Sequence, residues 1–287
     1  MTTLPLPTFP LAGFSVTRVG FGAMRLAQDG MGTRGEPRDP AVAVDVLRRV
    51  IELGITHIDT AEFYRSPDGR IGANDLIRQA LHPYPPDLVI ATKIGPVFHP
   101  GGFASATPAE VRPLVEANLT ALGLDRLELV YLRIGGMTPP HGESLAERFE
   151  ALAALQDEGI IGQLGLSNVD AGHLDEAQRI APVAAIQNLF DPTDPGEQAL
   201  LQRTTAEGIA FVPFGPLGMG QTRDRDRAYA AIAARHGATV PQVAIAHVLS
   251  LAGNTLAIPG TGSLTHLEDN TAAARLTLTP DDLDLLR

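Results

Sequence analysis

The sequence predicts an α/β protein built as one (β/α)8 barrel domain over residues 1–287, with a short N-terminal hairpin. Strand-like apolar runs alternate with helix-like segments along the chain, which favours right-handed βαβ units and a parallel sheet. Eight such runs in 287 residues fit a closed barrel better than an open, doubly wound sheet. No G-x-G-x-x-G motif opens a helix after the first run, which weakens the open dinucleotide-binding alternative.

The predicted elements follow one another in a regular order. The opening stretch TFPLAGFSV, residues 8–16, alternates apolar and polar positions and is expected to form the hairpin. The eight strand-like runs are residues 16–24, 56–61, 88–95, 127–134, 160–168, 183–190, 209–218 and 254–262. Helix-like segments, with apolar residues spaced by three and four, include residues 40–54, 107–123, 144–159 and 239–253. Starts such as Thr107-Pro108 and terminal glycines mark their boundaries.

The composition excludes several classes of function. The chain has no cysteine, so disulfides, thiolate nucleophiles and cysteine-ligated metals are impossible, and we predict no metal site. A formal net charge of −11 argues against a nucleic-acid partner, because phosphate binding needs clustered Lys and Arg. The densest basic cluster, RDRDRAYAAIAARH, alternates Arg with Asp and is expected to begin a solvated helix.

Membrane insertion and secretion are not expected either. No apolar run approaches the roughly 18 residues that a membrane helix needs. The opening MTTLPLPTFP has neither the basic nor the apolar part of a signal peptide. We therefore expect a cytoplasmic protein, whose oligomeric state the sequence leaves open.

Polar residues stand at the ends of successive predicted strands, where a barrel enzyme carries its chemistry. They are Asp59, Lys93, Arg133, Ser167, Asn168 and Gln187. One polar strand end would mean little, because an isolated Asp there is most often a helix cap or an ion-pair partner. So many in succession are hard to explain as core packing, and they predict a functional site.

Three of the residues near these ends can form a proton donor. Tyr64 follows Asp59 by five residues, and a tyrosine with its ordinary pKa of about 10 is a poor acid at neutral pH. A nearby ammonium from Lys93 is expected to lower that pKa, while Asp59 holds the lysine charged and oriented. Such a tyrosine can protonate a carbonyl oxygen if another group supplies a hydride. A bound nicotinamide is the natural hydride source.

With these residues in place, the sequence resembles the aldo-keto reductases over nearly its whole length. The motifs that carry the resemblance are VGFGAMRL, HIDTAEFY, VIATKIG, GQLGLSNV, IQNLFDP, VPFGPLG and IPGTGSLTHLEDN, in the family's order and spacing. Each motif alone is weak, but the set is specific. The resemblance implies a (β/α)8 barrel that reduces carbonyl groups of small aldehydes or ketones with NADPH.

The resemblance also implies a role for each matching residue. Tyr64 would be the proton donor, supported by Asp59 and Lys93, with Arg133 as a fourth catalytic residue. Ser167, Asn168 and Gln187 would hold the nicotinamide carboxamide, and Phe214 would stack on its ring. The implied cofactor-binding set is Gly22, Met24, Asp59, Ser167, Asn168, Gln187, Phe214, Pro216, Leu217, Gly218, Gly260, Thr261, Gly262, His266, Asp269 and Asn270.

Two departures from the family pattern bear on specificity. Arg133 stands where relatives usually have a histidine, and an arginine cannot shuttle protons, although it can bind an anionic substrate group. With LELVYLRI and LHPYPPDLVIATKIG, this arginine makes the chain similar to bacterial pyridoxal reductases, and an arginine would suit the phenolate beside the pyridoxal aldehyde. Gly260 and His266 replace the Lys and Arg often found opposite the cofactor 2′-phosphate. NADPH is still favoured and NADH is possible.

Several alternatives remain open at this point. The same scaffold could reduce an imine, although Arg133 would repel a cationic substrate. It could also be a slowly turning cofactor sensor, which the complete set of Asp59, Tyr64 and Lys93 disfavours. Because the sequence ends at TPDDLDLLR, the substrate pocket is expected to depend on the loops 25–31 and 96–106. His57 is expected to be a packed strand residue.

Overall fold

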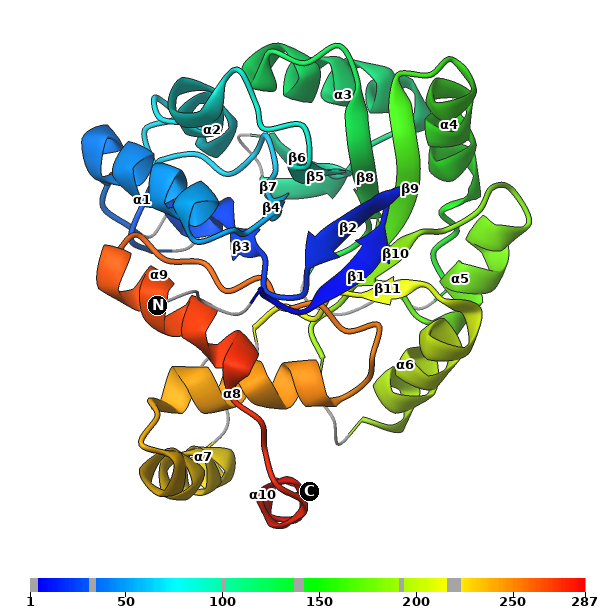
Figure 1. Ribbon diagram of the computed structural model, residues 1–287. Coiled ribbons are helices and arrows are strands. Elements are labelled where there is room, and N and C mark those ends of the chain that lie inside the picture. The colour runs from blue at the N-terminus through cyan, green and yellow to red at the C-terminus, as the bar shows by residue number, and fades with distance from the viewer. Residues whose placement is uncertain are drawn as a thin grey trace.

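The computed structural model describes residues 5–30, 35–99, 102–136, 142–190, 194–215 and 223–286. A curved parallel sheet forms the centre of the molecule, and helices surround its outer face (Figure 1). The order of its seven strands is β11-β10-β9-β8-β5-β4-β3. Their bounds are β3 (Phe21–Gly22), β4 (His57–Asp59), β5 (Val89–Ile94), β8 (Leu127–Arg133), β9 (Ile161–Ser167), β10 (Ala185–Gln187) and β11 (Ala210–Phe211).

A further segment closes this sheet into the predicted barrel. Residues 254–259 form parallel bridges on both sides, between Thr255 and Phe211 and between Ala257 and Val19. Backbone hydrogen bonds accompany both bridges, including 2.8 Å from the Leu256 amide to the Phe211 carbonyl and 2.8 Å from the Gly20 amide to the Ala257 carbonyl. All eight predicted strand-like runs therefore contribute to one closed parallel barrel.

The N-terminal hairpin covers one end of the barrel (Figure 1). Strands β1 (Thr8–Leu11) and β2 (Phe14–Thr17) pair antiparallel, as predicted. Leu11 and Val16 are buried in the same apolar cluster as Leu129 and Tyr131, which face the barrel interior from β8. Because this end is plugged by side chains, chemistry is confined to the opposite end, where the parallel strands terminate.

The helices begin at the capping residues that the sequence supplies. Asp39 caps α1 (Pro40–Glu52), and Thr107 and Thr239 form capping boxes with the third residues of α3 (Pro108–Leu122) and α8 (Val240–Ser250). The other helices are η1 (Ala23–Arg25), α2 (Ala73–Leu81), α4 (Ala146–Asp157), α5 (Ala171–Gln178), α6 (Pro195–Glu207), α7 (Arg223–His236), α9 (Leu264–Ala272), η3 (Ala273–Arg275) and α10 (Pro280–Leu285).

One element was not predicted. Strands β6 (Pro96–His99) and β7 (Gly102–Ser105) pair antiparallel in the loop after β5, where the sequence analysis expected irregular chain. The clue was a short apolar alternation on both sides of the sequence Pro-Gly-Gly. The hairpin extends the strand end that carries Lys93.

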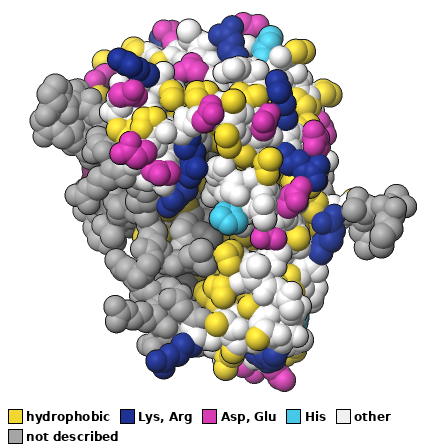
Figure 2. Space-filling model, turned by 90° about the vertical axis from the view of Figure 1, so that its left-hand side faces the viewer, with side chains coloured by type: hydrophobic (Ala, Val, Ile, Leu, Met, Phe, Trp, Pro, Cys, Tyr) yellow, Lys and Arg dark blue, Asp and Glu magenta, His cyan; other side chains and the backbone are white. Residues whose placement is uncertain are grey.

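The described helices and one face of the surface bear on membrane insertion and on charge distribution. None of the helices in the described ranges is long and apolar enough to cross a bilayer. Figure 2 faces the side that carries α1 and α9, where basic and acidic side chains are interspersed. This mixture agrees with the solvated, net-negative surface expected from the composition.

Candidate active site

A buried ion pair lies at the carboxyl ends of two neighbouring strands. Asp59 ends β4, and Lys93 lies near the end of β5, which pairs with β4 in parallel. The Lys93 ammonium donates to both carboxylate oxygens of Asp59, at 2.8 and 2.7 Å, and to the Thr60 carbonyl at 3.0 Å. Both side chains are about 3–4% exposed, so the pair is held in a region that excludes bulk water.

A third strand completes the environment of the carboxylate. The side-chain amide of Gln187, at the end of β10, donates to Oδ1 of Asp59 at 2.7 Å. Asp59 therefore accepts charge-assisted hydrogen bonds from both Lys93 and Gln187, which fixes its orientation. The ion pair and the Gln187 hydrogen bond together join Asp59 to two neighbouring side chains at the strand ends.

Tyr64 lies beside the ion pair in the turn that follows β4. The Tyr64 amide donates to the Ala61 carbonyl at 3.1 Å, and its carbonyl accepts from Ala73 at 2.8 Å at the start of α2. These bonds tie the tyrosine to two elements. Its ring centroid is 4.9 Å from the Lys93 ammonium, which is within cation–π range.

Lys93 lowers the pKa of Tyr64, as the sequence analysis expected, but the net shift is upward. Burial raises the pKa of Tyr64, and this effect outweighs the lowering by Lys93 and the smaller lowering by Arg133. For Lys93, burial alone would lower the pKa, but Asp59 and Tyr64 more than offset it and the net pKa is raised. The site therefore holds a neutral phenol beside a charged ammonium at neutral pH, which is the protonation state that a proton donor needs.

Arg133 ends β8 and extends toward the same site. Its guanidinium donates to Ser167 Oγ at 3.1 Å and to the Gly136 carbonyl at 2.7 Å, and its Cζ lies 5.4 Å from the ring centroid of Phe214. Burial lowers the pKa of Arg133, although Tyr64 and Asp59 partly offset this. Guanidinium is so weak an acid that the side chain stays charged. The structure therefore places a fixed cation beside the tyrosine.

These groups open onto a cavity of about 720 Å³. Its described lining joins residues from strand ends, from the α8 N-terminus and from α9. The lining residues are Gly22, Met24, Arg25, Asp59, Phe63, Tyr64, Lys93, Arg133, Gln187, Phe214, Gly215, Thr239, Pro241, Ile245, Ile258, Pro259, Gly260, Thr261, His266, Asp269 and Asn270. A cavity of this volume, lined by both apolar and charged side chains, has the size of a site for a large organic ligand.

Most of the predicted site residues that the structure describes meet in this cavity, but three do not line it. Ser167 and Asn168 are almost fully buried behind the wall. The Asn168 amide donates to the carbonyls of Ile134, at 2.8 Å, and Gly136. Gly262 lies outside the lining as well. The cofactor roles assigned to these three stay predictions.

The remaining predicted residues and loops either lie outside the described chain or contribute only in part to the lining. Pro216, Leu217 and Gly218 lie outside the described residues. Of the two loops expected to form the substrate pocket, the described lining includes Arg25 but nothing from the 96–106 loop.

Sequence reasoning missed part of the lining. Phe63 adjoins Tyr64 and packs edge-on against it with ring centroids 5.1 Å apart. Thr239, Pro241 and Ile245 come from the first turns of α8. The Thr-Pro pair signalled a helix start, but the sequence did not show that this start faces the cavity, because that depends on packing between α8 and α9.

The acidic residues of α9 divide between two surfaces. Glu268 pairs with Arg49 of α1 at 2.7 Å and does not line the cavity, whereas Asp269 does. The structure leaves only Asp269 in the lining.

His57 is buried in the barrel interior, as predicted. It precedes Asp59 by two residues on β4, so both side chains share one face of the strand. Burial lowers the pKa of His57 to about 4, which keeps the imidazole neutral near the catalytic pair. A Cβ on Gly20 would come within 2.8 Å of its Nδ1, so the glycine makes room for the ring.

The fold and the site together define a class of protein. A closed (β/α)8 barrel with a tyrosine, a lysine and an aspartate at the strand ends of one large cavity is a barrel enzyme equipped for proton transfer. Residues 18–287 match the family model described as "Aldo/keto reductase family". The chain belongs to this family, which makes it an oxidoreductase.

Individual relatives agree with this assignment. The chain is 42% identical over 286 residues to pyridoxine 4-dehydrogenase of Escherichia coli, covering 97% of this chain and 96% of that protein. It is 26% identical to the NADH-specific methylglyoxal reductase of the same organism, covering 100% of this chain and 98% of that protein. An aldo-keto reductase from Klebsiella pneumoniae, solved in complex with NADPH, is 28% identical with a TM-score of 0.78, covering 99% and 94%.

Proposed function

We propose that this protein reduces an aldehyde to an alcohol with NADPH, and that pyridoxal, converted to pyridoxine, is the preferred substrate. The observation that carries the proposal is the neutral Tyr64 phenol beside the buried pair of Lys93 and Asp59 at the cavity wall. Support for the substrate comes from Arg133 in the same lining and from the 42% identity to a pyridoxine 4-dehydrogenase.

The residues around the cavity fit a nicotinamide dinucleotide. The reactive ring would lie at the end lined by Tyr64, Gln187 and Phe214, and the adenosine end would lie along residues 260–270. Thr261, Asn270 and the N-terminus of α9 offer hydrogen-bond donors to its phosphates and sugars. When bound, the cofactor would supply the hydride that no side chain of the chain can provide.

The side chains of the chain would supply the proton and its control. The Tyr64 hydroxyl would donate a hydrogen bond to the carbonyl oxygen of the substrate and transfer its proton as negative charge develops there. The Lys93 ammonium would stabilise the phenolate that remains, and Asp59 would keep the lysine charged and in place. In the opposite direction, which the E. coli relative's name describes, the same phenolate would accept the proton of the alcohol.

Arg133 would determine which aldehydes react well. Its guanidinium faces the cavity next to Tyr64 while two of its hydrogen bonds hold it against Ser167 and Gly136. A cation fixed in this way can bind an anionic oxygen next to the aldehyde, such as the pyridoxal phenolate. It would disfavour a cationic imine, so imine reduction is the weaker candidate.

A panel of aldehydes, assayed with NADPH and NADH in parallel, tests this proposal. Arg133→Met keeps much of the bulk and removes the charge. Because hydrogen bonds to charged groups are worth roughly 1.5–3 kcal/mol, its kcat/KM for pyridoxal should fall about 10- to 150-fold. The loss for benzaldehyde, which has no anionic oxygen, should be much smaller.

A matched control separates the effect of the Arg133 charge on the substrate from the structural support that Arg133 gives to the site. Ser167→Ala removes one hydrogen bond to Arg133 but keeps its charge, so it should affect both aldehydes alike. Equal losses on both substrates for Arg133→Met would show that Arg133 supports the site and does not recognise the substrate. Failure of the wild-type protein to reduce any aldehyde with either cofactor would contradict the proposed activity.

A further inference from the structure

We propose that Arg38, which precedes α1, recognises the 2′-phosphate of NADPH in this protein. This inference rests on the proposed function, because it takes the adenosine end of the cofactor to lie along residues 260–270. It places the cation that binds the phosphate outside residues 260–270, in the segment before α1. Three features of the structure support it: the packing of Gly260, the contact between Arg38 and Gly262, and the distribution of charge.

The chain cannot place a cation at residue 260 without moving its backbone. A Cβ on Gly260 would come within 2.4 Å of the Gly22 carbonyl oxygen, and one on Gly22 within 2.6 Å of the Ile258 carbonyl oxygen. Such distances are too short for any side chain, so the two backbones require glycine where they pass each other. Residue 260 therefore supplies no cation, and a cation that binds the phosphate would come from another residue.

Arg38 approaches the same stretch from the other side. Its Nε donates to the carbonyls of Arg25, at 2.9 Å, and Gln28, at 3.2 Å. A Cβ on Gly262 would lie 2.6 Å from its Cζ and 2.7 Å from Nη1, so the guanidinium contacts the backbone of Gly262. Gly262 follows Thr261, a lining residue of the cavity. The absence of a side chain at residue 262 is what allows Arg38 to lie there.

The charge of Arg38 is not neutralised within the described chain. Among the described residues, no carboxylate lies within ion-pair distance of it, and its hydrogen bonds there start from Nε alone. The Nη groups are thus available to an anion held beside Gly262. The preorganised planar fork of an arginine suits the recognition of a phosphate.

The charged residues near Gly262 also favour phosphate binding by Arg38. Arg25 lies in the cavity lining, and its carbonyl binds Arg38, so a second cation is close by. Glu268, which would repel a phosphate, is paired with Arg49 at 2.7 Å. Asp269 is the acidic residue of α9 that remains in the lining. Arg25 and Arg38 therefore lie close together, and the Asp29 carboxylate of the same segment accepts a hydrogen bond from the Glu36 amide.

The test compares cofactors that differ only in the 2′-phosphate. Arg38→Met should weaken NADPH binding about 10- to 150-fold, the range expected for lost hydrogen bonds to a charged group, while NADH binding changes little. Dissociation constants from cofactor fluorescence, and from calorimetry with adenosine 2′,5′-bisphosphate against 5′-AMP, measure this selectivity. Arg38→Lys should recover part of it, because it restores the charge without the planar fork.

Arg48→Met is the matched control, because it removes an exposed cation of α1 that pairs only loosely with Asp45, at 3.8 Å. It should leave the ratio of NADPH to NADH affinity unchanged. Equal weakening of both cofactors by Arg38→Met would overturn the inference, as it would show a packing role, and so would no weakening of either. If the wild-type protein binds neither cofactor, the proposed function itself fails.

Discussion

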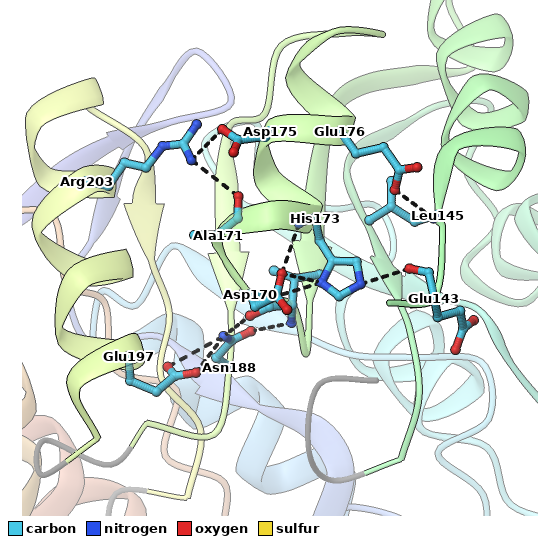
Figure 3. Close-up of polar contacts among 11 residues, drawn as sticks. Glu143, Leu145, Asp170, Ala171, His173, Asp175, Glu176, Asn188, Glu197 and Arg203 are labelled. Atoms are coloured by element: carbon cyan, nitrogen blue, oxygen red, sulfur yellow. Dashed lines mark hydrogen bonds and ion pairs between the residues drawn. The ribbon is translucent and has the colours of Figure 1, made fainter. Parts of the chain in front are cut away.

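Two polar clusters lie at the carboxyl ends of the barrel strands, and they have different roles. The first contains Asp59, Lys93 and Tyr64 and faces the cavity. The second, shown in Figure 3, gathers around Asp170 and His173 at the start of α5, after β9. Both combine a carboxylate with a nitrogen base at hydrogen-bond distance, and both are largely buried.

The second cluster connects parts of the chain to one another. The Asp170 amide donates to Nδ1 of His173 at 3.1 Å, and Nε2 lies 3.0 Å from the Glu143 carbonyl. Glu176 binds the Leu145 amide at 2.9 Å, so the segment before α4 is held against α5 (Figure 3). None of these residues belongs to the described lining of the cavity.

The comparison shows that a polar cluster at strand ends is not by itself an active site. What distinguishes the first cluster is that a phenol faces a cavity while its neighbours hold a charge out of water. In the second cluster, the carboxylate and imidazole bind backbone groups of adjacent segments, as helix caps and loop ties do. Substitutions should therefore affect chemistry in the first cluster and stability alone in the second.

The largest effect is expected from Lys93→Met. Removing one partner of a buried ion pair leaves Asp59 uncompensated, which costs about 3–5 kcal/mol in the free energy of unfolding. Turnover should fall as well, because no cation remains to stabilise the tyrosine phenolate. Denaturant titration and steady-state assays measure the two losses. The double variant Asp59→Asn/Lys93→Met should recover part of the stability and none of the activity. Full activity of Lys93→Met would contradict the assignment of chemistry to the first cluster.

A smaller and purely structural effect is expected from His173→Leu. The variant leaves the Asp170 amide and the Glu143 carbonyl without their partner, and an unsatisfied buried polar group costs about 1–3 kcal/mol. Urea unfolding should show this loss, whereas kcat/KM measured well below the melting temperature should be retained. A drop in turnover comparable to that of Lys93→Met, with unchanged stability, would assign the second cluster to catalysis.

The sequence predicted the barrel well because its signals are local and repeated. Apolar runs, Thr-Pro helix starts and terminal glycines recur along the chain and locate the elements without knowledge of the packing. The hairpin of β6 and β7 was missed because two short strands around the sequence Pro-Gly-Gly look like an irregular loop.

The sequence predicted the site residues that lie at strand ends. It did not predict the residues whose position depends on packing between helices and loops. Asp59, Lys93 and Tyr64 meet as the spacing suggested. The lowering of the Tyr64 pKa by Lys93 was foreseen, but the larger rise caused by burial was not, because desolvation depends on what surrounds the phenol. Thr239 and Arg38 approach the α9 side from distant segments, and one sequence contains no signal for such contacts.

The central claim is that Tyr64 donates the proton, and its most direct test is the pH dependence of single-turnover aldehyde reduction in wild type and Tyr64→Phe. Because burial raises the pKa of Tyr64, the phenol stays protonated through neutral pH, so the wild-type rate should be flat there and fall only at alkaline pH, above the ordinary titration range of a tyrosine. The variant should be about 10²–10⁴-fold slower, without that alkaline fall, while still binding cofactor. A variant that reduces the aldehyde at the wild-type rate would show that another group donates the proton.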